Sequence, residues 1–176
     1  FDLKQHIKFS WKDLSIFDEE TKDKVIPHVV AEPSLGVERA FLVFMFDAYG
    51  YDNQRGNVVL KLNPKLAPYK AAVFPLVSNK PQLTKKAKEV YTSLKKYFNV
   101  FYDESGSIGR RYSRQDEIGT PLCITIDFDS IKKNDVTIRD RDTTNQIRVK
   151  TKDLGHKVWE YINGVKFDKL GKAILK

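Results

Sequence analysis

The sequence predicts an α/β protein, with a regular unit of alternating strands and helices in residues 70–176. Short apolar runs typical of buried strands recur in this region, and segments with helical spacing of apolar residues separate them. The composition agrees, because 41% hydrophobic and 12% aromatic residues are typical of a globular chain. A chain of 176 residues can form one good core or two small ones.

The first 50 residues mix extended segments with one very apolar stretch. "IPHVV" (26–30) is short and β-branched, which predicts a strand, and "EPSLG" (32–36) supplies Pro and Gly for a turn. "VERAFLVFMFDAYG" (37–50) is apolar almost all round, so it predicts a buried helix ending at Gly50.

A linker is predicted at 51–69, where Asn, Gly and short apolar bursts alternate and two prolines close the segment. We therefore expect two domains, residues 1–63 and residues 64–176.

The C-terminal unit begins with a buried strand, "AAVFPLV" (71–77), and an amphipathic helix, "KPQLTKKAKEVYTSLKKYF" (80–98). The apolar face of this helix is expected to hold Leu83, Ala87, Val90, Tyr91, Leu94 and Phe98. Four further strands are predicted at 99–103, 122–128, 136–142 and 146–150. The last two strands form a hairpin, and a helix at 153–164 closes the unit.

Charge and cysteine content restrict the class of protein. The formal net charge of +8 and the pI near 9.4 favour a polyanionic partner, with nucleic acid ahead of a membrane. The alternative is a basic protein whose lysines serve only solubility. A single cysteine, Cys123, excludes a disulfide framework and a paired-cysteine zinc site. No run reaches a membrane span and no signal peptide precedes the chain, so a cytoplasmic protein is expected.

The stretch "YDESGSIGRRYSRQDEIG" (102–119) concentrates charge and turn residues between two apolar runs. Its glycines and serines can expose backbone N–H groups to an anion at a helix start. Its arginines offer guanidinium groups that can donate two hydrogen bonds at once, and its tyrosine offers a ring on which a base can stack. Its acidic side chains can accept hydrogen bonds from base amino groups. The candidate nucleic-acid-binding residues are Arg110, Arg111, Tyr112, Arg114, Asp116 and Glu117. The alternative is a salt-bridged surface helix.

A catalytic carboxylate pair is not expected, since Asp116 and Glu117 are adjacent and diverge by about 100° on a helix. The three histidines have no metal-site spacing, and no nucleophile motif is present, so we expect no metal site and no complete catalytic set.

"EPSLGVER" (32–39) is the second segment that is rich in candidate binding residues, and it is expected between the end of a strand and the start of a helix. Glu32 can receive a substrate ammonium, Gly36 permits close approach of a ligand, and Arg39 can clamp phosphate or stack on a base. A capped buried helix would have much the same sequence.

At these segments the chain resembles the glycyl-tRNA synthetase family. "VAEPSLGVERAF" is similar to motif 3 of class II aminoacyl-tRNA synthetases, and "YDESGSIGRRYSRQDEIGTP", "TIDFD" and "VTIRDRDTTNQIRV" resemble the anticodon-binding domain of the same enzymes. The resemblance covers essentially the whole chain. It implies the end of an antiparallel-sheet catalytic domain, followed by an anticodon-binding domain with a mixed five-stranded sheet flanked by helices.

The resemblance also implies an activity and its substrates. The family attaches glycine to tRNA-Gly through glycyl-adenylate, with ATP and Mg²⁺, and the intact enzyme is a homodimer. The glycine pocket would be lined by Glu32, Pro33, Ser34, Leu35 and Gly36. The ATP site would be lined by Gly36, Val37, Glu38 and Arg39. The anticodon would be bound by Arg110, Arg111, Tyr112, Arg114, Asp116 and Glu117.

Motifs 1 and 2 of the family are absent, and the chain opens at Phe1 rather than Met. We therefore expect a piece of a longer protein that does not form glycyl-adenylate alone. Two other functions stay open: a stand-alone anticodon-like RNA-binding or regulatory module, and a generic basic nucleic-acid binder. "EPSLGVER" argues against the first, and the acids within "RRYSRQDE" argue against the second.

Overall fold

The structure is a computed structural model that describes residues 3–26 and 33–174. The chain divides into two compact units, Phe1–Ala40 and Phe41–Lys176, and each is described by itself. The described part of the first unit has helix α1 (Leu3–Ser10) and an antiparallel hairpin of β1 (Ile16–Asp18) and β2 (Asp23–Val25). Most of the strand expected at 26–30 lies outside the described residues.

Helix α2 (Val37–Ala48) exposes most of its apolar surface. Its exposed large apolar side chains are Val37, Phe41, Leu42, Val43, Phe44 and Phe46. The prediction of a buried helix ending at Gly50 is therefore wrong for this structure. The helix ends two residues earlier because Tyr49 and Gly50 pair with a neighbouring strand.

A hairpin replaces the expected linker. Strands β3 (Tyr49–Asp52) and β4 (Asn57–Leu60) pair in antiparallel fashion, and Val59 and Leu60 are buried. The alternating residues that suggested a linker are thus those of a short strand that packs against helix α4. The domain boundary near residue 63 stays a prediction, whereas the compact units part after Ala40.

The second unit is built on a six-stranded mixed sheet of order β10-β9-β8-β7-β5-β6. Its strands are β5 (Ala71–Pro75), β6 (Val100–Tyr102), β7 (Leu122–Ile126), β8 (Asp135–Asp140), β9 (Gln146–Lys150) and β10 (Lys172–Ala173). Its helices are α3 (Pro81–Lys95), α4 (Ile108–Ile118), α5 (Phe128–Lys133), α6 (Leu154–Ile162) and the short 3-10 turns η1 (Thr151–Asp153) and η2 (Phe167–Lys169). β5 runs parallel to β6 and β7, and the other pairs are antiparallel.

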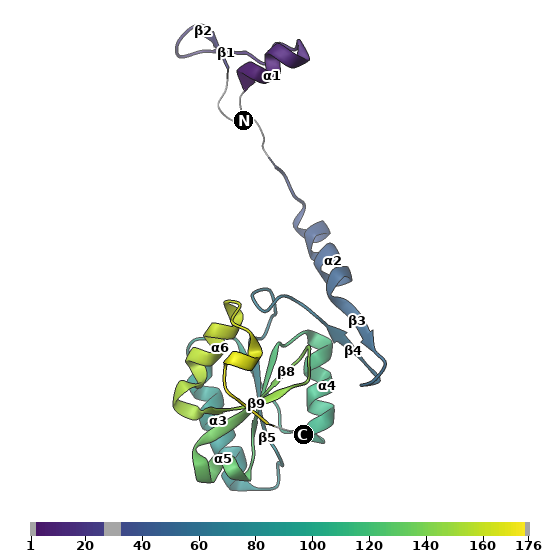
Figure 1. Ribbon diagram of the computed structural model, residues 1–176, viewed down its shortest axis with the longest axis vertical. Coiled ribbons are helices and arrows are strands. Elements are labelled where there is room, and N and C mark those ends of the chain that lie inside the picture. The colour runs from purple at the N-terminus through teal and green to yellow at the C-terminus, as the bar shows by residue number, and fades with distance from the viewer. Residues whose placement is uncertain (1–2, 27–32, 175–176) are drawn as a thin grey trace. The chain divides into compact units, whose positions relative to one another are not determined.

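The predicted α/β class and mixed sheet are confirmed, with six strands in place of five. The additional strand, β10, has only two residues, which is too short to leave a pattern in the sequence. Helices cover both faces of the sheet, with α3 and α6 on one side and α4 on the other (Figure 1). The larger core lies under α3 and α6, and its helical side chains from α3 are Leu83, Ala87, Val90 and Leu94, as the spacing predicts. Cys123 is buried under α4 beside Ala72 and Phe74.

Asp127 lies between β7 and α5, and its carboxyl group is expected to make the free energy of unfolding depend on pH. Its carboxylate accepts from the Ser130 amide at 2.9 Å and from the Arg148 guanidinium at 2.5 Å. Burial alone would raise the pKa of Asp127, but the bonds from Ser130 and the Arg148 charge outweigh it and hold the pKa below its ordinary value. The resulting stabilisation is present above the unfolded pKa and is lost as the pH falls through the lower folded pKa.

Asp127→Asn keeps a capping side chain but removes the charge, so it should lower the free energy of unfolding by about 1–2 kcal/mol at pH 7. The difference from the unchanged chain should shrink below about pH 4, where the carboxyl group becomes protonated. Urea unfolding between pH 3 and pH 7 measures it. A difference that stays constant over this range would show that the charge of Asp127 contributes nothing.

Candidate nucleic-acid interface

The carboxyl ends of β5, β6 and β7 meet at one edge of the sheet. Helix α3 connects β5 to β6, and helix α4 connects β6 to β7. These two helices lie on opposite faces of the sheet. In open α/β sheets, ligands bind outside the carboxyl ends of strands at such a reversal of strand order. We call this edge, formed by residues 76–80, 103–110 and 127–128, the carboxyl edge.

Two arginines of α4 hold the loop after β6 in place. The buried Arg111 guanidinium donates to the carbonyl oxygens of Pro75, Leu76 (3.3 Å) and Gly106 (3.1 Å). Arg114 pairs with Asp103 and donates to the Ser105 carbonyl at 2.7 Å. These bonds fix a loop that, as a surface connection, would otherwise be mobile.

Local sequence also fixes the start of α4 at this edge. Gly106 has a φ of +74°, a conformation that glycine adopts without strain. Ser107 is the N-cap, and its side chain accepts from the Arg110 amide at 3.4 Å. The helix therefore begins beside the loop, with the amides of Arg110 and Arg111 both bound to Ser107.

Arg110 is the arginine left for a ligand. Its side chain is exposed and makes no hydrogen bond or ion pair within the described part of the chain. It lies in the first turn of α4, at the carboxyl edge. An exposed guanidinium on a fixed helix start can donate to a phosphate or to two acceptors of one base.

Tyr112 and Asp116 face the protein. The Tyr112 hydroxyl bonds the Thr125 hydroxyl at 2.7 Å, and its ring packs against Phe74. Asp116 is 1% exposed and accepts from the Arg139 guanidinium at 2.9 and 3.0 Å and from Arg55 at 3.3 Å. Burial disfavours the charged form of Arg139, but the bonds and charge of Asp116 outweigh it and raise the pKa of Arg139.

Glu117 is exposed but lies two turns beyond Arg110, about 10 Å further along the helix axis. The structure thus does not gather the six predicted residues into one surface. It places Arg110 at the carboxyl edge with the half-exposed Arg114, and uses Arg111 and Asp116 inside the fold.

Two residue groups at this edge escaped the sequence analysis. Phe128 is 51% exposed at the start of α5, directly after β7, although the sequence predicts it as part of the strand. The signal that could have found it is Asp127 followed by Ser130, which form a capping box and end the strand at Ile126. Ser78, Asn79 and Lys80 are exposed in the loop after β5.

The segment 32–39 belongs to the other unit. Glu32 lies outside the described residues, and Pro33 to Arg39 are exposed, with the last three in the first turn of α2. The assignments to glycine and ATP stay predictions. Within residues 3–26 and 33–174, no group of three or more His, Cys, Asp or Glu side chains could hold a metal ion. In the same ranges no helix combines the length and apolar character needed to cross a bilayer.

Comparison with known proteins decides the family. A model described as "Anticodon binding domain" matches residues 70–161, which include β5 through most of α6. The chain belongs to the anticodon binding domain family. The carboxyl edge, with Arg110 and Phe128, lies within the matched domain.

Curated relatives extend the similarity beyond this domain. The chain is 52% identical over 157 residues to a glycine–tRNA ligase of Clostridium tetani and 51% identical over 161 residues to one of Corynebacterium efficiens. It is also 52% identical over 151 residues to a glycine–tRNA ligase of Caldanaerobacter subterraneus. These matches cover 88%, 88% and 85% of this chain but 33%, 34% and 32% of the relatives. The chain thus spans about a third of their length, and the resemblance to glycyl-tRNA synthetases is confirmed.

Proposed function

We propose that this chain is the anticodon-reading part of a glycine–tRNA ligase. The observation that carries the proposal is Arg110, an exposed guanidinium without a hydrogen-bond or ion-pair partner among the described residues. It lies on a loop and helix start that Arg111 and Arg114 hold in place. The names of the relatives support the choice of tRNA-Gly as the RNA.

Recognition at this edge follows the chemistry of single-stranded RNA, whose unstacked bases are read by stacking and by contacts to their edges. Arg110 donates to base acceptors, and the exposed ring of Phe128 provides a stacking surface. Lys80 supplies positive charge for phosphates, while Arg114, paired with Asp103, holds the loop in place. Arg111, Tyr112 and Asp116 act by holding this surface in place, and Glu117 lies outside it.

The parent protein would join glycine to tRNA-Gly through glycyl-adenylate in the cytoplasm, as a homodimer, with ATP as a substrate and Mg²⁺ as the counter-ion of ATP. Within this chain, residues Glu32 to Gly36 would line the glycine pocket and Gly36 to Arg39 the ATP site. The chain alone would form no adenylate. Aminoacyl transfer needs no protein nucleophile, so its chemistry is positioning and neutralisation of charge.

The test is the binding of the chain to tRNA-Gly and to the same tRNA with a changed second or third anticodon base, at one fixed salt concentration. Each lost base contact should weaken binding by about 1–3 kcal/mol, or roughly 5- to 150-fold. Equal dissociation constants for the two RNAs would contradict anticodon reading.

Phe128→Ala should weaken binding to tRNA-Gly by about 1–2 kcal/mol, because a stacking surface is removed. The free energy of unfolding should change little, since half of the side chain is already in solvent. Ile131→Ala is a matched control, because that side chain is also partly exposed, at 42%, and lies about one turn further along α5, outside the carboxyl edge. A loss of the same size in both variants would show that Phe128 has no direct contact with RNA.

A further inference from the structure

Helix α3 carries an excess of positive charge. From Pro81 to Lys96 the chain has five lysines and one glutamate. None of these lysines forms an ion pair with a carboxylate in the described part of the chain, whereas Lys22, Lys24, Lys133 and Lys157 elsewhere do. The helix is therefore free to attract an anion.

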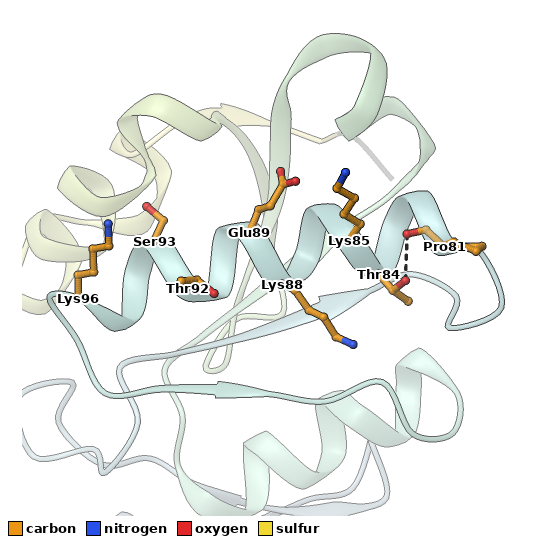
Figure 2. Close-up of a pocket in the computed structure, with 8 residues that line it drawn as sticks. All are labelled: Pro81, Thr84, Lys85, Lys88, Glu89, Thr92, Ser93 and Lys96. Carbon is orange, nitrogen blue, oxygen red and sulfur yellow. Dashed lines mark hydrogen bonds between the residues drawn. The ribbon is translucent and has the colours of Figure 1, made fainter.

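Three of these lysines, Lys85, Lys88 and Lys96, line a shallow depression along the helix. Figure 2 shows Lys85 and Glu89 extending from one side of α3, with Lys88 on the other side and Lys96 at the end of the helix. The Lys88 ammonium also lies 5.8 Å from the centre of the Tyr102 ring. The spacing spreads positive charge along the whole helix, about 17 Å from Lys85 to Lys96.

An apolar groove of 640 Å³ adjoins the depression, and Ser93 lines both. Its floor comes from α3 and α6, and its rim carries Tyr97, Lys152, His156 and Trp159. Tyr97 is 75% exposed and Trp159 is 55% exposed. The His156 ring stacks on the Trp159 ring, with 6.1 Å between the ring centres and an angle of 13° between the ring planes.

Lysines along a track, followed by exposed aromatic rings, are the pattern with which proteins bind single-stranded nucleic acid. The lysines neutralise phosphates, and the flat rings stack on bases. An acidic peptide would also satisfy the lysines, but its carboxylates do not stack on the Trp159 ring, whereas every nucleotide pairs its phosphate with a base that can stack. The chemistry of the surface therefore favours RNA over a protein partner.

We propose that the α3–α6 surface, formed by Lys85, Lys88, Lys96, Tyr97, Lys152 and Trp159, is a second RNA-binding surface that holds an unpaired RNA segment, with phosphates on the lysines and a base stacked on Trp159. It lies on the face of the sheet opposite α4, so it is separate from Arg110. The proposal rests on the proposed function only in taking tRNA as one of its RNA ligands.

Fluorescence of Trp159 tests the stacking directly. The chain has two tryptophans, so Trp11→Phe leaves Trp159 as the single source of tryptophan fluorescence. Titration with a 12-nucleotide oligouridylate, and separately with tRNA-Gly, should quench this emission in a saturable way that weakens as salt is added. No quenching at saturating RNA would overturn the proposal.

The lysines are tested by Lys85→Gln, Lys88→Gln and Lys96→Gln combined. The triple variant should bind oligouridylate about 10-fold or more weakly, with a shallower dependence on salt. Lys61→Gln, Lys65→Gln and Lys172→Gln combined are the matched control, because these exposed lysines lie elsewhere and change the net charge equally. Equal losses in both triple variants would mean attraction by net charge alone and would overturn the proposal.

A third experiment distinguishes the α3–α6 surface from the proposed anticodon site at Arg110. Arg110→Ala should leave quenching of Trp159 by oligouridylate unchanged. If a changed anticodon base has no effect on tRNA binding while quenching and the lysine effect persist, the anticodon proposal fails and the α3–α6 surface stands. Quenching that disappears in Arg110→Ala would overturn the existence of a separate surface.

Discussion

Replacing Asp116 with alanine is expected to lower the free energy of unfolding by about 3–5 kcal/mol, because it leaves a buried guanidinium without its carboxylate. Arg139 is 6% exposed and gives Asp116 two hydrogen bonds, and Arg55 adds a third from the hairpin of β3 and β4. The Arg139 guanidinium also lies 4.8 Å from the centre of the Tyr112 ring. One carboxylate therefore joins α4, β8 and the hairpin.

Urea unfolding measures this effect, and Glu117→Ala is the matched control. Glu117 is the next residue and carries the same charge, but it is exposed, so its loss should change stability by less than about 0.5 kcal/mol. Asp116→Ala combined with Arg139→Met should recover part of the loss, since the second change removes the unpaired charge. A loss below about 1 kcal/mol for Asp116→Ala would contradict a structural role for this pair.

Arg111→Ala is expected to destabilise the chain by about 3 kcal/mol, because the buried Pro75 carbonyl loses its donor at a cost of about 1–3 kcal/mol and the partly buried Leu76 and Gly106 carbonyls lose theirs at a smaller cost. The guanidinium is 1% exposed and serves the carbonyls of Pro75, Leu76 and Gly106 at once. The Leu76 and Gly106 carbonyls belong to two of the three segments that form the carboxyl edge, and the Pro75 carbonyl ends β5. Binding to tRNA-Gly should therefore weaken together with stability.

Arg111→Lys sharpens this prediction. A lysine ammonium is a point donor and lacks the planar fork that spans several carbonyl groups, so this variant should recover less than half of the lost stability. Arg110→Ala is the neighbouring control and should leave the unfolding transition unchanged while weakening RNA binding. Full stability of Arg111→Lys would show that charge alone, without the fork geometry, supports the loop.

Much of the fold could be predicted from the sequence, because strong periodicity leaves few alternatives. The buried positions of α3 follow the helical spacing, and the strands β5 and β7 are continuous apolar runs. The hairpin of β3 and β4 was missed because its two strands have four residues each and its turn looked like a linker. Strand β10 pairs through only two residues, so no sequence pattern marks it.

The candidate site was predicted as a segment but not as a surface. Arginines at 110, 111 and 114 look alike in the sequence, and only the turn of the helix decides which side chain meets water. Burial then assigns Arg111 to three backbone carbonyls and leaves Arg110 exposed. Phe128 was missed for the related reason that an aromatic residue after an apolar run resembles the end of a strand.

The most direct test of the account is a double-mutant cycle between Arg110 and one anticodon base. Dissociation constants are measured for the unchanged chain and Arg110→Ala, each with tRNA-Gly and with tRNA-Gly changed at the second or third anticodon base. Direct reading predicts a coupling of about 1 kcal/mol or more for at least one base, so that the RNA change has little further effect once Arg110 is gone. Fully additive losses for both bases would contradict the claim that Arg110 reads the anticodon.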